Sequence, residues 1–245
     1  MSEQHEQTIS LNKYISDTGR CSRREADKLI AEGRVLLNGV PARLGNRVAP
    51  GDEVLLDGAP IGESDKPRPV YLALYKPVGI VCTTEQNIKN NIIDYVNYPE
   101  RIFPIGRLDK PSEGLILLTN DGNIVNKILR AGNRHEKEYI VSVNQAITKN
   151  FVTQMSAGVP VLDTVTQPCT VERLGKHTFR IVLTQGLNRQ IRRMCNYLGY
   201  EVTALKRIRI MDIQLGQLKP GHWRLLTQKE IRHLHDTLKD SKKTA

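Results

Sequence analysis

The chain has 245 residues, 39% of them apolar, which is enough for one catalytic domain and a small module. No apolar run reaches the roughly 18 residues of a membrane span and the start lacks a signal peptide, so we expect a soluble, cytoplasmic protein. The net charge of +10 favours a polyanionic partner, whereas the 5% aromatic content argues against a surface of stacked rings for single strands. The four scattered cysteines contain no Cys-x-x-Cys pair, so neither a disulfide framework nor a zinc site is indicated.

The first 58 residues contain clear signals for where helices and turns begin and end. Residues 1–8 are polar and predicted to be disordered. The apolar spacing within 11–15 predicts a short helix, and the S-x-x-E capping box from Ser22 to Glu25, with Gly33 beyond the end, predicts a second. Asn-Gly at 38–39 and Asp-Gly at 57–58 each follow an apolar run, which predicts two short hairpins.

Basic side chains gather at the start of the second predicted helix. Arg side chains and free backbone N–H groups at a helix N-terminus can hold phosphates; a merely solvated helix face is the alternative. Residues 9–58 resemble an S4 domain, an RNA-binding module, on the residues Leu-Asn-Lys-Tyr-Ile, Cys-Ser-Arg-Arg-Glu-Ala-Asp and Val-Leu-Leu-Asn-Gly. We assign RNA contact in this module to Lys13, Arg20, Arg23, Arg24 and Lys28. The Pro-rich, charged residues 59–70 are predicted to be a linker.

The stretch 104–114 is the candidate centre of the larger domain, which we predict to cover residues 71–238. It lies between two apolar runs, so it is predicted to be a loop joining two mostly buried strands. Arg107, Asp109 and Lys110 stand in its middle. A carboxylate held at a sheet end beside basic groups is a candidate catalytic acid, base or nucleophile; a solvated surface turn is the alternative.

The other predicted elements of this domain alternate between strands and capped helices. Tyr139 begins one strand, where its ring could face a pocket or simply pack in the core. The tail from Lys239 is predicted to be loose. The predicted strands lie at 71–75, 139–143, 169–171, 179–184 and 223–226, and the predicted helices start near 121, 148 and 227.

Residues 185–199 are predicted to form an amphipathic helix. Ile191, Met194, Cys195 and Leu198 share one face, and three arginines, Arg189, Arg192 and Arg193, fall on the other. From Gln185 to Arg209 there are six basic residues and one acid, a net +5 that is half of the excess of the chain. A solvated basic face is possible, but so dense a group of arginines favours phosphate contact.

Three segments together resemble the active-site motifs of pseudouridine synthases: Gly-Arg-Leu-Asp at 106–109, Lys-Glu-Tyr at 137–139 and Gly-Leu-Asn-Arg-Gln-Ile-Arg-Arg-Met at 186–194. With an S4 domain in front, the resemblance is to the RsuA branch, which acts on ribosomal RNA. It implies an α+β chain whose catalytic domain has a mainly antiparallel mixed sheet flanked by helices. It also implies a catalytic Asp109, a base-stacking Tyr139, Arg192 as the basic partner of the aspartate, and Leu205 in the pocket.

The resemblance implies that the chain isomerises a uridine, in a stem-loop of large-subunit (23S) ribosomal RNA, after the base is flipped out. A transfer RNA stays open as a second substrate, and we expect a monomer. Asp109 could attack ribose C1′ or uracil C6, or act as an acid–base group. The rearrangement imports no electron or group, so it implies no cofactor and no metal, and no nucleotide-binding motif is present. The residues assigned to substrate binding are Arg107, Leu205, Arg189, Arg193, Lys206 and Arg207.

Two other classes of protein remain open at this point. The chain could be a non-catalytic ribosomal RNA-binding protein that uses its S4 module. It could also be a hydrolytic N-glycosidase with Asp109 and Glu113 as paired carboxylates. A tRNA-charging enzyme is disfavoured because no ATP-binding signature is present.

Overall fold

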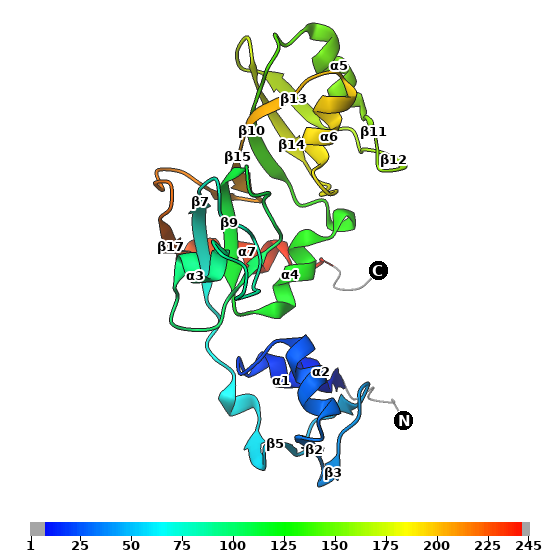
Figure 1. The fold of residues 1–245 in the computed structure, drawn as a ribbon, viewed down its shortest axis with the longest axis vertical. Helices are drawn as coiled ribbons and strands as arrows, with labels where there is room; N and C mark the ends of the chain where they lie inside the picture. The colour runs from blue at the N-terminus through cyan, green and yellow to red at the C-terminus, as the bar shows by residue number, and fades with distance from the viewer. Residues whose placement is uncertain (1–7, 242–245) are drawn as a thin grey trace. The chain divides into compact units, whose positions relative to one another are not determined.

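The computed structural model describes residues 8–241, which form two compact units (Figure 1). The first contains the chain up to Pro69 together with Pro99–Arg101, and the second contains Val70–Tyr98 and the chain from Ile102 onward. Most of the predicted disordered start and of the predicted loose tail, residues 1–7 and 242–245, lies outside the described residues. None of the helices built by residues 8–241 is long and apolar enough to cross a membrane.

The first unit contains two helices and two small sheets. Its main sheet has the antiparallel order β3-β2-β5-β6, and β1 pairs separately with β4. Strand β6 lies in the stretch assigned to the linker, where it pairs with β5. The elements are β1 (Ile9–Ser10), α1 (Leu11–Asp17), α2 (Arg23–Ala31), β2 (Val35–Leu37), β3 (Val40–Pro41), β4 (Arg47–Val48), β5 (Val54–Leu56), β6 (Ala59–Ile61) and the 3-10 turn η1 (Glu63–Asp65).

Local sequence explains why these elements begin and turn where they do. The Ser22 hydroxyl accepts the backbone N–H of Glu25, and the Glu25 carboxylate accepts the N–H of Ser22, so the capping box of α2 is complete. Asn38 and Gly39 both have positive φ, as do Asp57 and Gly58, which matches the twist that two-residue hairpins require. The two helices and β2 then bury Ile15, Ile30 and Val35 in one core.

The second unit is built on one nine-stranded sheet. Its strand order is β13-β14-β10-β15-β9-β7-β17, with β16 paired to β15 and β8 paired to β9. The strands are β7 (Tyr71–Lys76), β8 (Phe103–Ile105), β9 (Glu113–Thr119), β10 (Lys137–Val143), β11 (Pro160–Val161), β12 (Thr164–Val165), β13 (Thr170–Arg173), β14 (Thr178–Leu183), β15 (Val202–Ile210), β16 (Ile213–Gln214) and β17 (Trp223–Leu225), of which β11 and β12 form a separate pair. The helices are α3 (Ile92–Val96), α4 (Gly122–Leu129), α5 (Lys149–Ala157), α6 (Gln190–Tyr197) and α7 (Gln228–Thr237), with a 3-10 turn η2 (Ala131–Asn133).

The sheet is mainly antiparallel, as the resemblance to pseudouridine synthases implies, and helices lie at both of its ends. In Figure 1, α5 and α6 lie beside β13 and β14, whereas α3, α4 and α7 lie near β7 and β9. The two faces of the sheet bury different apolar clusters. One contains Leu72, Tyr139 and Phe179, and the other contains Ala73, Leu117 and Leu234. The mixed α+β class is therefore confirmed.

One parallel contact joins the two halves of the sheet. Strand β15 pairs with β9 only at Lys206↔Glu113 and Arg207↔Gly114. Gly114 has φ +107°, and a Cβ placed there would lie 2.2 Å from the carbonyl oxygen of Arg207. Glycine is thus required for the backbones to approach this closely.

The helix predicted over 185–199 is shorter than expected. Helix α6 starts only at Gln190, because Arg189 adopts a left-handed conformation with φ 51° and acts as the N-cap. Residues 185–188 are a loop tied to the helix by Gln190, whose side-chain oxygen accepts the backbone N–H of Leu187. Arg189 therefore does not share a helical face with Arg192 and Arg193. The short helix α3, capped by Asn91, had no prediction.

Replacing Gly114 with alanine should lower the free energy of unfolding by roughly 3 kcal/mol. The φ of +107° is strained for alanine, and the new Cβ would clash with the backbone of β15. Urea denaturation of the purified protein measures this loss. Gly175→Ala is the matched control, because nothing lies within 4 Å of a Cβ there and its φ is not in the positive range. Equal stability of the two variants would contradict the account of the β9–β15 contact.

Candidate active site

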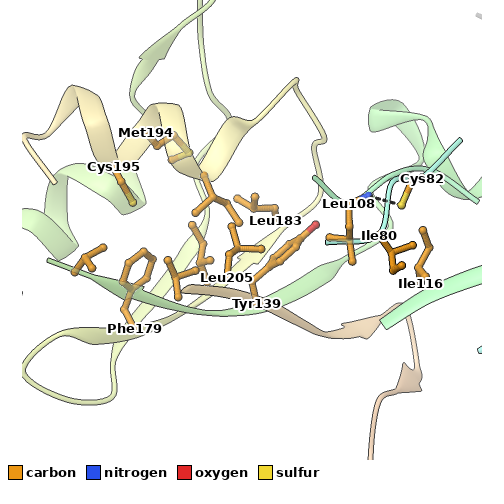
Figure 2. Close-up of a cluster of buried hydrophobic side chains, with 14 of the residues drawn as sticks. Ile80, Cys82, Leu108, Ile116, Tyr139, Phe179, Leu183, Met194, Cys195 and Leu205 are labelled. Atoms are coloured by element: carbon orange, nitrogen blue, oxygen red, sulfur yellow. Dashed lines mark hydrogen bonds between the residues drawn. The ribbon is translucent and has the colours of Figure 1, made fainter. Parts of the chain in front are cut away.

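Asp109 lies in the loop between β8 and β9, at the edge of a cavity. A turn closes immediately after it, since the backbone N–H of Ser112 donates to the Asp109 carbonyl at 3.0 Å. The preceding residue, Leu108, is buried and its N–H donates to the Cys82 thiol sulfur at 3.4 Å, which is the dashed contact in Figure 2. The loop is therefore anchored on both sides of Asp109, and the carboxylate remains 33% exposed. It is not a freely solvated turn.

Two arginines face the Asp109 carboxylate. Arg192 Nε lies 3.8 Å and Arg189 Nη1 lies 3.9 Å from the same oxygen, Oδ2. Both contacts are longer than a hydrogen bond, so they are ion pairs without direct proton sharing. The two guanidinium groups place positive charge on the same side of the carboxylate.

Arg192 is the more firmly held of the two arginines. Its side chain is 13% exposed, and its terminal nitrogens donate to the Ser112 hydroxyl at 3.1 Å and to the carbonyls of Pro111 and Val202 at 3.3 Å. Burial lowers the pKa of the guanidinium, and Asp109 opposes that shift. Arg192 Nε is buried and has no hydrogen-bond partner within the described chain, and the Asp109 carboxylate lies 3.8 Å from it.

Tyr139 and Leu205 form the apolar wall of the cavity. They project from neighbouring strands, β10 and β15, and both are buried. Figure 2 shows the Tyr139 ring lying between Leu205 and Leu108. The cavity encloses about 400 Å³ and is lined by these three side chains, by Asp109 and by the 185–192 segment. Its size suits one small ligand with an aromatic or planar group.

Two buried cations complete the lining of the cavity. Arg207 is 4% exposed, donates from Nε to the Leu115 carbonyl at 2.6 Å, and places its guanidinium carbon 6.0 Å from the centre of the Tyr139 ring. Lys137 is 7% exposed and donates to the His135 carbonyl at 3.2 Å. Burial and the neighbouring Arg207 lower the pKa of Lys137 to about 8.

The structure separates the predicted substrate-binding residues into two groups. Arg107, Arg189, Leu205 and Arg207 line the cavity together with Asp109, Tyr139 and Arg192. Lys206 does not line it, because neighbouring side chains of a strand alternate and its ammonium lies over the Tyr75 ring at 5.8 Å. Arg193 does not line it either, since its guanidinium is bound to the Asn188 carbonyl at 3.0 Å.

The predicted row of guanidinium groups on one helix face is therefore wrong. Arg189 precedes the helix, Arg192 turns inward to Ser112, and Arg193 folds back on Asn188. The paired carboxylates expected for a glycosidase are not found either. Glu113 is not among the residues that line the cavity, and its carboxylate accepts a hydrogen bond from the Tyr75 hydroxyl.

The basic residues assigned to RNA contact in the S4 module lie in the first unit. Arg23, Arg24 and Lys28 are exposed on α2. Lys13 is paired with Asp17 on α1, and Arg20 lies 3.7 Å from Asp65. Within residues 8–241, Arg23 and Arg24 stand at the start of a capped helix without an acidic partner, whereas Lys13 and Arg20 each have one.

Sequence reasoning missed three residues that shape the site. Ser112 binds Arg192, Lys137 lines the cavity, and Lys76 is fully buried with its ammonium on the Pro77 carbonyl at 2.8 Å. A signal existed for Lys137, since it opens the Lys-Glu-Tyr segment two residues before Tyr139, where strand alternation puts both on one face. Within residues 8–241, no group of three or more His, Cys, Asp or Glu side chains is arranged to hold a metal ion.

Comparisons with known proteins agree with this arrangement. An RNA pseudouridylate synthase family model matches residues 70–197, and an S4 domain model matches residues 10–54. The fold and the site thus define an RNA pseudouridine synthase with an S4 domain. The chain belongs to the RsuA branch of this family, and its resemblance to that branch is confirmed.

Three individual proteins are similar to this chain over most of its length. The dual-specificity RNA pseudouridine synthase RluF of Escherichia coli (strain K12) is 54% identical over 234 residues, which covers 96% of this chain and 81% of that protein. The ribosomal large subunit pseudouridine synthase B of Bacillus subtilis (strain 168) is 36% identical over 233 residues, which covers 91% of this chain and 94% of that protein. A crystal structure of a pseudouridylate synthase superposes with a TM-score of 0.68 at 28% identity, covering 92% of this chain and 99% of the other. The chain is an RNA-modifying enzyme, so the non-catalytic alternative is excluded.

Replacing Ser112 with alanine should slow turnover about tenfold, because Arg192 loses a hydrogen bond that fixes it beside Asp109. RNA affinity should change little, since Ser112 is buried under the guanidinium. Single-turnover kinetics and filter binding measure the two quantities. Ser156→Ala, which removes a comparable hydroxyl bonded to a backbone carbonyl in α5, is the control. An unaltered rate in Ser112→Ala would contradict the positioning of Arg192 by this hydroxyl.

The lowered pKa of Lys137 predicts a pH-dependent stability. Above pH 10.5 the amine is neutral in both states, and below pH 8 it is charged in both; between these values only the unfolded chain binds the proton. The contribution of Lys137 should therefore lower the free energy of unfolding by about 3 kcal/mol as the pH drops from 10.5 to 8. Lys137→Met should remove this contribution to the slope of the free energy of unfolding against pH. It should also be more stable than the wild type at pH 7. Urea titrations across this range compare the two proteins, and identical slopes would contradict the buried state of Lys137.

Proposed function

We propose that this enzyme converts a uridine in a stem-loop of large-subunit ribosomal RNA to pseudouridine, with Asp109 as its catalytic group and a transfer RNA as a second substrate. The observation that carries the catalytic assignment is the placement of one carboxylate, between two guanidinium groups, in a cavity that also holds a buried aromatic ring. The relative from Bacillus subtilis is named for the large ribosomal subunit, and the one from Escherichia coli for dual specificity. These names support the choice of substrates.

The reaction assigns a task to each of these groups. The bond between uracil N1 and ribose C1′ breaks, the base turns, and C1′ joins C5 while a C5 proton leaves. Asp109 serves either as the nucleophile at C1′ or C6 or as the acid–base group, and Arg189 and Arg192 face its carboxylate at the edge of the cavity. The Tyr139 ring gives the detached base a face to stack on while it turns.

The cavity requires the target uridine to leave its stack. A volume of about 400 Å³ admits one nucleoside and excludes a helical stem. Extrusion of a base costs a few kcal/mol, least where the nucleotide is already in a loop, which favours a stem-loop target. Arg107 is exposed at the cavity and is suited to the phosphate of the extruded nucleotide or to the gap left in the stack.

The S4 unit supplies a separate, sequence-independent contact with RNA. Arg23 and Arg24 stand in the first turn of α2, where their charges and the free N–H groups of the helix N-terminus act together on phosphates. Such contacts position an RNA without reading its bases. Selection of the uridine then rests with the cavity and the loop around Asp109.

Asp109→Asn should abolish pseudouridine formation, with RNA affinity within about twofold of the wild type, because the amide keeps the shape of the carboxylate without its charge. A strain lacking the gene is complemented with either form, and pseudouridines are mapped in its total RNA. The wild type should restore modification in large-subunit ribosomal RNA and in a transfer RNA, and Asp109→Asn in neither. Modification restored by Asp109→Asn would remove this residue from catalysis. Modification restored only in other RNAs would refute the proposed substrates and leave the catalytic role standing.

Replacing Arg23 and Arg24 together with alanine should weaken RNA binding and reduce the slope of log affinity against log salt concentration by about 1 to 2, since each phosphate contact releases counterions. Filter binding over a series of salt concentrations measures the slope. A double Arg34→Ala, Arg43→Ala variant of the same unit is the control, because Arg34 is already bound to Asp57. If both variants have the wild-type slope, α2 does not contact phosphate.

A further inference from the structure

The two buried cations of the cavity, Lys137 and Arg207, have no carboxylate partner. Among the described residues, neither forms an ion pair, and each makes one hydrogen bond, to a backbone carbonyl. The Nη2 nitrogen of Arg207 is buried and has no hydrogen-bond partner within the described chain. Both side chains line the same cavity as Asp109.

Three arginines of this unit that are partly withdrawn from water face a carboxylate, whereas the fully buried Lys76 donates to the Pro77 carbonyl at 2.8 Å and forms no ion pair within the described chain. Arg180 and Arg209 share the buried Glu138, at 2.5 and 2.6 Å. Arg192 faces Asp109. Burying a charge without a partner is costly, and Lys137 and Arg207 are the unpaired buried cations that line the cavity, so they require an explanation. A negative charge that enters the cavity with the substrate would compensate both.

Strand geometry brings the two cations to one wall. Lys137 and Tyr139 are two residues apart on β10, and Leu205 and Arg207 are two apart on β15, so each pair projects from one face of its strand. Tyr139 pairs with Arg207 across the two strands. The cations therefore flank the ring on which the base is expected to stack.

The depth of these cations distinguishes a base from a phosphate. Arg107 and Arg189 are exposed at the cavity, Arg189 by 48%, and can reach a phosphate that stays in water. Lys137 and Arg207 are almost fully buried, so only a group that enters the cavity completely can contact them. In an extruded nucleotide that group is the base.

We propose that Lys137 and Arg207 form an oxyanion site, which holds the negative charge that develops on the carbonyl oxygens of uracil during the isomerisation. The proposal rests on the pseudouridine synthase activity and on no particular RNA target. It gives Lys137 and Arg207 the task of stabilising the negative charge on uracil. No such task is assigned to Asp109, Arg192 or Tyr139.

The electron balance supports this assignment for either route of attack. When N1–C1′ breaks, its electron pair stays on uracil, and the charge is shared by N1, O2 and O4. When the carboxylate instead adds to C6, the C5=C6 pair moves into the conjugated carbonyl and the charge lands on O4. In both cases C5 later supplies the pair that bonds C1′, and the carboxylate leaves C1′ in the first route or C6 in the second. The C5 proton leaves, N1 ends with a proton, and the oxyanion returns to a carbonyl. A fixed cation stabilises the charged stage more than the neutral base.

The test compares variants of Lys137 on total RNA labelled with 5-tritiated uridine and taken from a strain lacking the gene. Released tritium reports the loss of the C5 proton, so wild-type release establishes the activity independently of the oxyanion site. Lys137→Met should slow single-turnover release by about 100-fold while its affinity for RNA stays within about twofold, and Lys137→Arg should restore much of the rate. Lys149→Met, at an exposed position on α5, is the control and should equal the wild type.

A pH profile gives a readout that a purely structural role would not change. The charged and titratable groups around Lys137 are Arg207 on β15, His135 before β10, and Asp109, Arg107, Arg189 and Arg192 across the cavity. Since Lys137 loses its charge as the pH rises through about 8, wild-type turnover should decline above that value, and Lys137→Arg should decline less. Asp109→Asn gives the background rate of tritium release in the assay.

Three results would overturn the proposal. The first is a wild-type rate in a folded Lys137→Met. The second is a loss of RNA affinity that accounts for the whole loss of rate, which would make Lys137 a phosphate contact. The third is an equal decline with pH in the wild type and Lys137→Arg, which remains measurable if Lys137→Met does not fold.

Discussion

The active site depends on the short parallel contact between β9 and β15. It pairs only two residues of each strand, yet it is the only junction between the β7–β9 and β10–β14 halves of the described sheet. The Asp109 loop enters β9 at this point, and β15 carries Leu205 and Arg207 past it. Gly114 allows the approach because its missing side chain leaves room for the Arg207 carbonyl. A single glycine therefore sets the distance between the proposed catalytic carboxylate and the wall that faces it.

Electrostatics differ between the parts of this junction. The buried Glu138 is matched by two guanidinium groups, and the partly exposed Asp109 faces two more. The cavity wall at Lys137 and Arg207 instead has an excess of positive charge. Such an excess destabilises the empty protein and becomes favourable only when a negative charge arrives, which is the usual relation between preorganised sites and fold stability. Under the oxyanion role proposed for Lys137 and Arg207, part of the catalytic effect is stored as a local cost in the free protein.

Local sequence signals predicted the elements but not all of their contacts. The capping boxes at Ser22 and Thr227 and the Asn-Gly turn at 38–39 are short-range features, and they form as the residues dictate. The extent of α6 was overestimated, because helical periodicity cannot reveal that Arg189 adopts a left-handed conformation. The inward turn of Arg192 depends on Ser112, which is eighty residues away in the sequence.

The same limit applies to the pairing of strands. The resemblance to the family located Asp109, Tyr139 and Arg192, which the structure brings to one cavity. It gave no reason to separate Arg207 from Lys206, since adjacent basic residues look equivalent until the strand register places one in the cavity and the other over Tyr75. Long-range register, set by the packing of two sheet faces, decides which charges meet the substrate.

The nine-stranded sheet ends in two open strands, β13 and β17, and each end is protected from pairing with another copy of the chain. At β13, Glu172 lies opposite Arg180 and Arg173 follows it, so an incoming strand would have to desolvate alternating charges. At β17 only three residues are extended before the capped helix α7 begins. Copies of a protein with such edges can come close together without their sheets joining edge to edge.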